Sequence, residues 1–328
     1  MRSRRTPVWR PSADQMKHWP AASGNAINGV GEETRRRPSP VYWHAPETIP
    51  HGPLQRWFYE RTGDGDGTLA EARRDRQRAI DEPLEPVAED TSEMAADEWT
   101  ANTKRAALEA GADDVGVAPM RTEYVFEGFE VPKYQWMIVI AVEQAYDAIE
   151  AAPSMRTLIE VTRQYARGTR AAKGLANWLR TQGQEAFPYG GPMAGSFVLI
   201  PAAIEAGLGE LGKHGSMIHP RFGSNFRLAC VLTNAALVAD GRNDFGAADF
   251  CARCQVCSDA CPPNAIGDEK ALVRGERRWY VDFDKCLPYF NEAYSCAICL
   301  AVCPFSRPNI GVNLVQKLAA RRSARRGS

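Results

Sequence analysis

Eight of the nine cysteines lie between residues 251 and 303, in two runs that each end in Cys-Pro. The first run reads Cys251-x2-Cys254-x2-Cys257-x3-Cys261-Pro262, and the second reads Cys286-x9-Cys296-x2-Cys299-x3-Cys303-Pro304. A [4Fe–4S] cluster needs four thiolates at the corners of a tetrahedron. Two-residue gaps let one loop supply three of these corners, so each run needs a fourth ligand from elsewhere.

A crossed set of ligands follows from this spacing, because in proteins with two such clusters the cysteine before proline ligates the other cluster. One predicted set consists of Cys251, Cys254, Cys257 and Cys303. The other consists of Cys286, Cys296, Cys299 and Cys261. A pair of zinc sites is the alternative, although zinc ribbons usually have separated Cys-x2-Cys pairs. Disulfides are disfavoured because the sequence shows no sign of export.

The overall composition predicts a globular protein without a membrane span. The chain has 328 residues, of which 44% are hydrophobic, and no apolar run approaches the length of a transmembrane helix. No apolar region follows the Arg4-Arg5 pair, so we expect no twin-arginine export signal and predict a cytoplasmic location. The 40 basic and 40 acidic residues give zero formal net charge, which argues against a nucleic-acid partner.

The remaining cysteine and the C-terminal charges have simpler interpretations. Cys230 lies in the apolar run 228–232 and is predicted to be a buried core thiol. The basic tail is predicted to be a solvated end; its charged residues are Lys317, Arg321, Arg322, Arg325 and Arg326.

Residues 1–90 are rich in Pro, Arg and Gly, but they also carry aromatic residues, which disordered chains lack. We therefore predict an irregular arm that packs its aromatic side chains on the main body, followed by an acidic linker over 81–90. A disordered leader is the alternative. The aromatic residues in question are Trp9, Trp19, Trp43, Trp57, Phe58 and Tyr59.

Regular patterns begin after residue 90 and alternate between helix and strand. They predict a helix from Ser92 to Ala110, strands at 114–118 and 136–142, a helix from Ser154 to Thr181, a loop over 187–195, a helix from Pro201, a strand at 227–234 and a last helix from about Val312. The strand at 136–142 is apolar on both faces, as in a sheet covered by helices.

The alternation indicates an α/β (α+β) domain over residues 91–245. A ferredoxin-like module with two clusters is expected over 246–310, and a C-terminal helix with the basic tail over 311–328. The glycine-rich fingerprints of dinucleotide and nucleotide sites are absent in their required context, so nicotinamide or nucleotide chemistry has little support.

The block 200–234 resembles the cobalamin-dependent reductive dehalogenases, and its glycine-rich Gly-Lys-His part is also similar to the epoxyqueuosine reductases. The second cysteine run, with Cys286-Leu-Pro-Tyr-Phe well ahead of the closing cysteines, resembles the dehalogenase form. The segment 103–119 is similar to the start of the core of that family. The resemblance covers roughly residues 95–308 and is weak over residues 1–90.

The resemblance implies a nitroreductase-like domain that binds a base-off cobalamin, with one iron–sulfur cluster near the cobalt and the other near the surface. None of the five histidines sits in an Asp-x-His-x-x-Gly arrangement, which agrees with a corrinoid that takes no protein ligand. The residues expected to contact the corrinoid are Gly207, Gly209, Gly212, Lys213, His214 and Gly215. Unaided, the glycines are equally consistent with a helix end and a turn.

In the resembled family a tyrosine supplies the proton and an arginine lowers its pKa and holds it in place. The resemblance places these roles on Tyr165 and Arg227. From periodicity alone, Tyr165 is an ordinary core residue on the apolar stripe of its helix. Arg227, at the start of a strand, is equally consistent with pairing to a carboxylate.

One departure from the family concerns a third polar residue, Asn or Lys, in the loop after the tyrosine helix. The matching stretch here, 188–195, contains no Asn, Lys or acid, and Tyr189 is its only hydrogen-bonding side chain. Either Tyr189 takes that place at the cofactor, or the substrate or the reaction differs from the family's.

The leading functional prediction is an enzyme resembling reductive dehalogenases that removes halide from a small organohalide. Its electrons would come from a separate ferredoxin or flavodoxin, since no such module is recognisable in the sequence. Deoxygenation of a modified nucleoside, as in epoxyqueuosine reductase, is one alternative. A corrinoid-free electron-transfer protein with two clusters is the other.

Overall fold

The computed structural model describes residues 9–63, 67–191 and 195–326, with the side chains of the last turns of the C-terminal helix left undescribed. Three predictions fall partly outside these ranges. They concern the Arg4-Arg5 pair, positions 192–194 of the loop after the tyrosine helix, and the side chains of Arg322, Arg325 and Arg326 in the basic tail.

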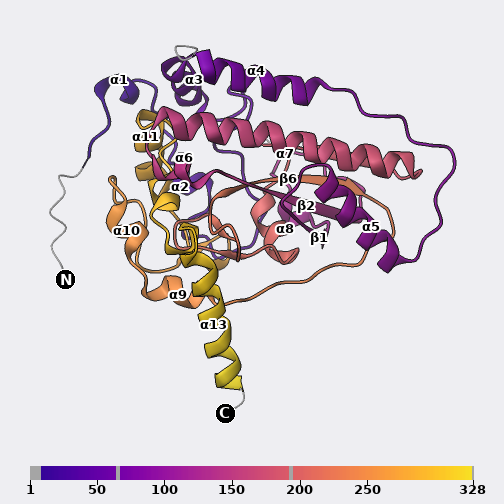
Figure 1. Cartoon of the computed structure of the whole chain (residues 1–328). Helices are drawn as coiled ribbons and strands as arrows, with labels where there is room; N and C mark the ends of the chain where they lie inside the picture. Colours follow the sequence, from indigo (N-terminus) through magenta and orange to yellow (C-terminus); the bar gives the residue numbers. More distant parts are fainter. Residues whose placement is uncertain (1–8, 64–66, 192–194, 327–328) are drawn as a thin grey trace.

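A four-stranded antiparallel sheet forms the centre of the molecule (Figure 1). Its strand order is β1 (Asp114–Pro119), β2 (Trp136–Glu143), β6 (Phe226–Thr233) and β3 (Ala186–Tyr189). Strand β2 buries both of its faces, because Ile138, Ile140 and Val142 face one core cluster while Met137 and Val139 face another. The sequence prediction of a strand covered on both sides is confirmed.

Helices cover the two faces of this sheet. On one side lie α5 (Ala96–Glu109) and the long α7 (Met155–Thr181), and on the other lies α8 (Leu199–Glu205). Ser154 caps α7, since its hydroxyl accepts a hydrogen bond from the Thr157 N–H, and Gly183 just past the helix has a φ of 78°. Cys230 lies in β6 with 0% exposure, as predicted for a core thiol.

Two predicted boundaries of regular structure are wrong. Helix α5 begins at Ala96 rather than at Ser92, because the Ser92 hydroxyl donates to the Gln182 side chain instead of capping the helix. Positions 187–189, predicted to be loop, are paired in β3. Strand β3 is the edge of the sheet, where Pro188 is tolerated because an edge strand does not need every N–H for pairing.

The N-terminal segment is not the irregular arm that its composition suggested. It contains the short helices α1 (Ala13–Met16) and α2 (Gly24–Ile27) and the longer helices α3 (Gly52–Thr62) and α4 (Gly67–Asp81). Helix α4 runs alongside α7, as Figure 1 shows. Pairing with another helix stabilises a segment whose own hydrophobic pattern is weak.

The aromatic residues of this segment do pack on the main body. Trp57 lies in a core cluster with Leu287, and Phe58 lies in another with Leu158 and Ile159 of α7. The ring of Trp9 meets Tyr289 edge to face, with the ring centroids 5.1 Å apart. The described residues of the segment are therefore ordered, which excludes a disordered leader over them.

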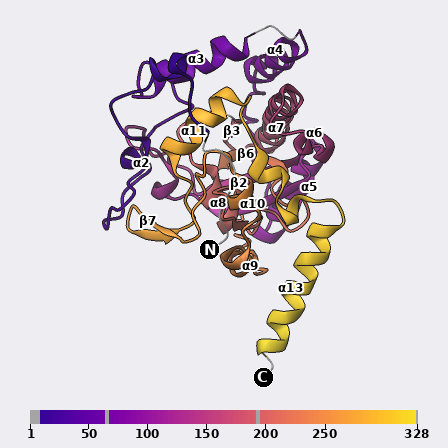
Figure 2. The same ribbon diagram turned by 90° about the vertical axis from the view of Figure 1, so that its left-hand side faces the viewer.

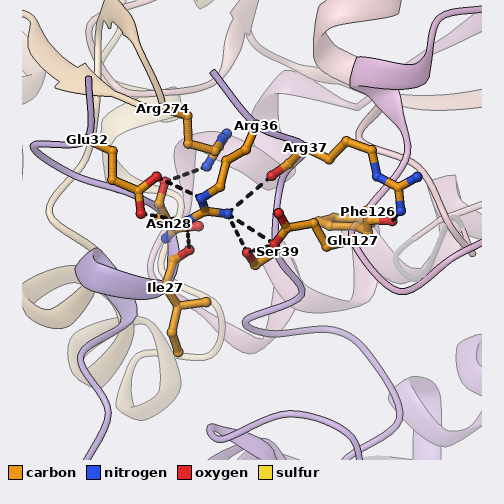
Figure 3. A network of polar contacts seen from close by, with 9 residues as sticks. All are labelled: Ile27, Asn28, Glu32, Arg36, Arg37, Ser39, Phe126, Glu127 and Arg274. Atoms are coloured by element: carbon orange, nitrogen blue, oxygen red, sulfur yellow. Dashed lines mark hydrogen bonds and ion pairs between the residues drawn. The ribbon is translucent and has the colours of Figure 1, made fainter. Parts of the chain in front are cut away.

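A polar network also holds the segment in place (Figure 3). The Arg36 guanidinium pairs with Glu32 and with Glu127 of the main body. The Arg37 guanidinium donates to the backbone carbonyl of Phe126, and the Arg274 guanidinium donates to that of Asn28. These contacts connect the N-terminal segment to two separate parts of the chain.

Smaller elements complete the fold. Before the cysteine runs lie η1 (Thr122–Tyr124), α6 (Tyr146–Glu150), β4 (Glu210–Leu211) and β5 (Met217–Ile218). The cluster module, residues 246–310, contains α9 (Ala247–Arg253), α10 (Val256–Ala260), the hairpin β7 (Ala271–Val273) and β8 (Glu276–Arg278), α11 (Phe283–Glu292), α12 (Ile298–Ala301) and η2 (Pro304–Ser306).

The C-terminal helix α13 (Ile310–Arg326) points away from the body of the molecule in Figure 2. Its first turns pack on the cluster module through Leu314, Val315 and Leu318. Within the described ranges, no helix combines the length and apolar character needed to cross a bilayer.

Candidate redox and catalytic site

The eight cysteines of the two runs gather in two groups. The pKa of Cys303 is raised to about 12, mainly by burial and also by the nearby thiolates of Cys251, Cys257 and Cys254. Cys303 thus lies beside the three cysteines of the other run. We call Cys251, Cys254, Cys257 and Cys303 the first cysteine group.

The second cysteine group consists of Cys261, Cys286, Cys296 and Cys299. Burial raises the pKa of Cys299 well above its usual value, with further contributions from the thiolates of Cys286, Cys296, Cys257 and Cys261. The contribution of Cys257 shows that the two groups are neighbours. All of these thiols are free, as ligation of an iron–sulfur cluster requires.

The chain around the second group has an unusual backbone. Tyr294, Ser295, Cys296 and Ala297 are consecutive residues other than glycine, and all have positive φ, between 48° and 68°. This conformation is unfavourable for side chains with a Cβ. Such backbone strain, here at and around Cys296, is typical of functional sites.

Cavity 1, with a volume of about 1130 Å³, lies between the sheet domain and the cluster module. Gly209, His214 and Gly215 line it on one side. On the other side it is lined by all four cysteines of the second group. The volume is at the upper end of small-molecule sites, which suits a large cofactor.

His214 offers no free nitrogen to a ligand in cavity 1. Its Nδ1 accepts a hydrogen bond from the Ser216 N–H at 3.2 Å, so Nε2 carries the proton and donates to the Ser224 hydroxyl at 3.1 Å. The Ser224 hydroxyl in turn donates to the Met217 carbonyl. Burial lowers the pKa of His214 to about 4, so the ring is neutral.

The glycines around cavity 1 are required mainly by neighbouring protein atoms. A Cβ on Gly207 would lie 2.7 Å from the Gly241 carbonyl oxygen, and one on Gly209 would lie 2.1 Å from that of Ile218. A Cβ on Gly212 would meet the His214 ring. Gly207 and Gly212 do not line the cavity, so the predicted corrinoid contacts in this block reduce to Gly209, His214 and Gly215.

The hairpin β7–β8 adds positive charge to the wall of cavity 1. Burial lowers the pKa of Arg274 to about 10 and also lowers that of Arg278. Both residues border the cavity. Guanidinium groups in such a position suit an anionic group of the ligand.

Cavity 2, with a volume of about 390 Å³, brings Tyr165 and Arg227 together. Tyr165 comes from α7 and Arg227 from β6, and the guanidinium carbon lies 5.6 Å from the centroid of the phenol ring. Within the described residues Arg227 forms no ion pair, and its buried Nε has no hydrogen-bond partner. Val198 and Ile200 line both cavities, so the two spaces adjoin.

Three residues that the sequence did not predict to be part of a site also line cavity 2. They are Tyr42, Trp43 and His44 of the N-terminal segment. The buried Gln55 side chain fixes this stretch, because its Oε1 accepts from the Trp43 N–H at 2.6 Å and its Nε2 donates to the His44 carbonyl at 2.7 Å. The only signal in the sequence was the unexpected aromatic content of the segment.

Tyr189 and Lys213 do not line either cavity, in contrast to their predicted cofactor contacts, although each packs on residues that do. The ring of Tyr189 packs edge to face on Phe197, with a centroid distance of 4.8 Å. Lys213 has an exposed fraction of 1% and points towards Trp279. Besides Tyr165 and Arg227, cavity 2 is lined by the polar side chain of His44. The sequence had led us to expect such a third polar residue from the loop after α7.

Comparison with known protein families identifies the cluster module. Residues 250–306 match the family model described as a 4Fe-4S dicluster domain. The tetrachloroethene reductive dehalogenase of Desulfitobacterium hafniense is 33% identical over 184 residues, which cover 52% of this chain and 33% of that protein. Its counterpart from Sulfurospirillum multivorans is 32% identical over 186 residues, covering 54% of this chain and 36% of that protein.

The epoxyqueuosine reductase of Leadbetterella byssophila is similar over a shorter stretch. It is 32% identical over 127 residues, which cover 33% of this chain and 37% of that protein. The chain thus spans about a third of the length of these curated relatives.

Solved structures share the fold over almost the whole chain. The catabolic reductive dehalogenase NpRdhA superposes with a TM-score of 0.72 and 21% identity, covering 95% of this chain and 50% of that one. A second reductive dehalogenase structure gives a TM-score of 0.65 and 22% identity, covering 97% of this chain and 46% of that one.

These findings first define the class: a helix-covered antiparallel sheet joined to a 4Fe-4S dicluster domain. More specifically, the chain is similar in sequence to reductive dehalogenases over about half of its length and shares their fold. The dicluster match also favours iron–sulfur clusters over the zinc alternative.

Proposed function

We propose that this chain is the catalytic part of a reductive dehalogenase-like enzyme that removes halide from a small organohalide. The carbon–halogen bond is replaced by a carbon–hydrogen bond, with two electrons from an external ferredoxin or flavodoxin and one proton. The halide leaves as an anion. The observation that carries the proposal is the pairing of Tyr165 and Arg227 in a cavity adjoining a larger one lined by cluster cysteines.

Cavity 1 is the proposed site of a base-off cobalamin, and the two cysteine groups are the proposed ligands of two [4Fe–4S] clusters. When bound, the cobalamin supplies a strongly reducing metal centre and the clusters supply its electrons. The hydrogen-bonded state of His214 argues against this residue as a ligand of the cobalt, because neither ring nitrogen is free to bind a metal. Arg274 and Arg278 suit the anionic part of such a cofactor.

Cavity 2 is the proposed substrate site, and its residues have distinct roles. The Tyr165 hydroxyl delivers the proton to the carbon that loses the halogen. The Arg227 guanidinium, which lies over the same ring, holds the phenol in place. The rings of Trp43, Phe197 and Phe226 exclude water from this space.

The proposed proton donor is tested by Tyr165→Phe, which keeps the ring and removes only the hydroxyl. Cluster and cobalamin contents should match the wild type, while turnover falls by about two to four orders of magnitude. Tyr134→Phe, which removes a hydroxyl outside cavity 2, is the matched control and should retain turnover. Full activity of Tyr165→Phe would overturn the proposed role.

The reaction itself is tested first, with the wild-type protein reconstituted with iron, sulfide and cobalamin and supplied with a strong artificial reductant. The panel contains halophenols, haloalkenes and an epoxyqueuosine nucleoside. Halide release supports the proposal, whereas turnover of the nucleoside alone would replace it by the deoxygenation reaction. A protein that binds clusters but no cobalamin would leave only electron transfer.

A further inference from the structure

Lys213 is a deeply buried cation without a hydrogen-bond partner. It follows β4, its exposed fraction is 1%, and its Nζ makes no hydrogen bond within the described part of the chain. The ammonium lies 5.0 Å from the centroid of the Trp279 ring. An ammonium at this depth is costly unless negative charge lies nearby, and a cation–π contact offsets only part of the cost.

The nearby negative charge comes from the first cysteine group. Cys251 lies in a core cluster with Trp279 and Cys303, and the backbone N–H of Lys213 donates to its sulfur. The Lys213 ammonium lies close enough to Cys251 and Cys257 to interact electrostatically with both sulfurs.

The second cysteine group has other neighbours. Burial raises the pKa of Cys286 to about 12, with contributions from Cys296, Cys261 and Asp282. These neighbours are thiolates and a carboxylate, which add negative charge. A carboxylate, that of Glu210, also acts on Cys251 of the first group, so the two groups differ by the buried Lys213 ammonium beside the first.

We propose that Lys213 assists electron transfer by compensating the charge of the cluster bound to the first cysteine group. The nearby ammonium makes that cluster easier to reduce. Reduction adds a negative charge, and a buried cation stabilises that charge strongly because the interior screens it poorly. The inference goes beyond the proposed reaction. It requires only the clusters, so it can be tested without substrate or cobalamin.

The test is an anaerobic redox titration of the cluster-loaded protein, followed by electron paramagnetic resonance. In Lys213→Gln and Lys213→Leu, the potential of one cluster should shift to more negative values while the other stays at its wild-type value. Lys213→Arg keeps the charge and should stay near the wild type. In a Cys286→Ala background, which should lack the second cluster, the remaining signal should show the same negative shift.

Lys270→Gln is the matched control, because Lys270 also lies over the Trp279 ring, at 5.8 Å, but is exposed to solvent. Water screens its charge, so both potentials should remain unchanged. Unchanged potentials in Lys213→Gln, or equal shifts in Lys213→Gln and Lys270→Gln, would overturn the proposal. If the uncharged variants fold without binding iron while Lys213→Arg binds it, charge compensation is supported through cluster assembly instead.

Discussion

In the cluster module, each cysteine run supplies three of the four cysteines of one group. Cavity 2, in contrast, is lined by segments that are far apart in the sequence. The first cysteine group needs only Cys303 from outside the run 251–257. Cavity 2 needs α7, β6, the loop before α8 and the stretch 42–44 of the N-terminal segment. The ligand set is thus largely a local property, and the proposed substrate site is a tertiary one.

The two regions also differ in the effect that substitutions should have. Thiolate ligands must keep their spacing, because the corners of a cluster are set by its geometry. The walls of cavity 2 depend on how the N-terminal segment is anchored, through Gln55 and the Arg36 network. We therefore expect changes in the first region to remove a cofactor and changes in the second to alter substrate use.

The largest effect is expected for Cys303→Ala, which tests whether the cluster module depends on crossed ligands. Iron should fall from about eight to about four atoms per chain, because one cluster loses its fourth ligand. The lost signal should belong to the cluster held by Cys251, Cys254 and Cys257. Iron analysis and electron paramagnetic resonance measure this, with Cys230→Ala as a control that keeps all iron. Loss of the other cluster would disprove the crossed assignment.

The next effect concerns the connection between the sheet domain and the cluster module, which Glu210 makes. Its carboxylate accepts from the N–H groups of Phe245, Gly246, Ala247 and Ala248 at 2.7 to 3.1 Å, at the start of α9. Glu210→Ala removes this acceptor, leaves only Gly246 with another partner, Asp244, and should reduce the free energy of unfolding by about 3 kcal/mol.

Denaturant unfolding of the cluster-loaded protein measures the effect of Glu210→Ala. Glu130→Ala, at an exposed position, serves as its control and should change stability by less than about 0.5 kcal/mol. Equal stability of the two variants would mean that α9 does not need this carboxylate.

A smaller effect is expected for Gln55→Ala, which tests the dependence of cavity 2 on the N-terminal segment. Two buried hydrogen bonds to the backbone of Trp43 and His44 are lost, at a cost of about 2 kcal/mol. The KM of any substrate found should rise, while the cluster content stays unchanged. Gln77→Ala, on the exposed face of α4, should leave both unchanged. An unaltered KM in Gln55→Ala would separate this stretch from the substrate site.

The smallest effect is a pH dependence of stability that comes from His214. Its pKa is lowered to about 4 in the folded protein, against about 6.5 when unfolded, so the unfolded state binds more protons between these values. Stability from this residue is present above pH 6.5 and decreases as the pH falls towards 4. Between pH 7 and pH 5.5 the loss should be about 1 kcal/mol. His214→Asn should show a shallower pH dependence, and an identical slope would contradict the buried neutral ring.

The sequence alone determined the parts of this protein that depend on neighbouring residues. The cysteine spacing indicated two sets of four ligands, and hydrophobic periodicity placed α7, β2 and β6 close to their observed bounds. The predicted bounds of these three elements were close because the period of a helix or strand is a property of a short stretch of chain, as is the spacing of the cysteines.

Only the tertiary structure decided the rest. Pro188 pairs in β3 because that strand happens to be an edge, and α4 is helical beside a partner, α7, that its own sequence does not reveal. Lys213, taken from its motif as a contact of the cofactor cavity, lies against Trp279 and Cys251 instead. Which residues a buried side chain contacts depends on how distant segments pack together. Local residue patterns do not encode that packing.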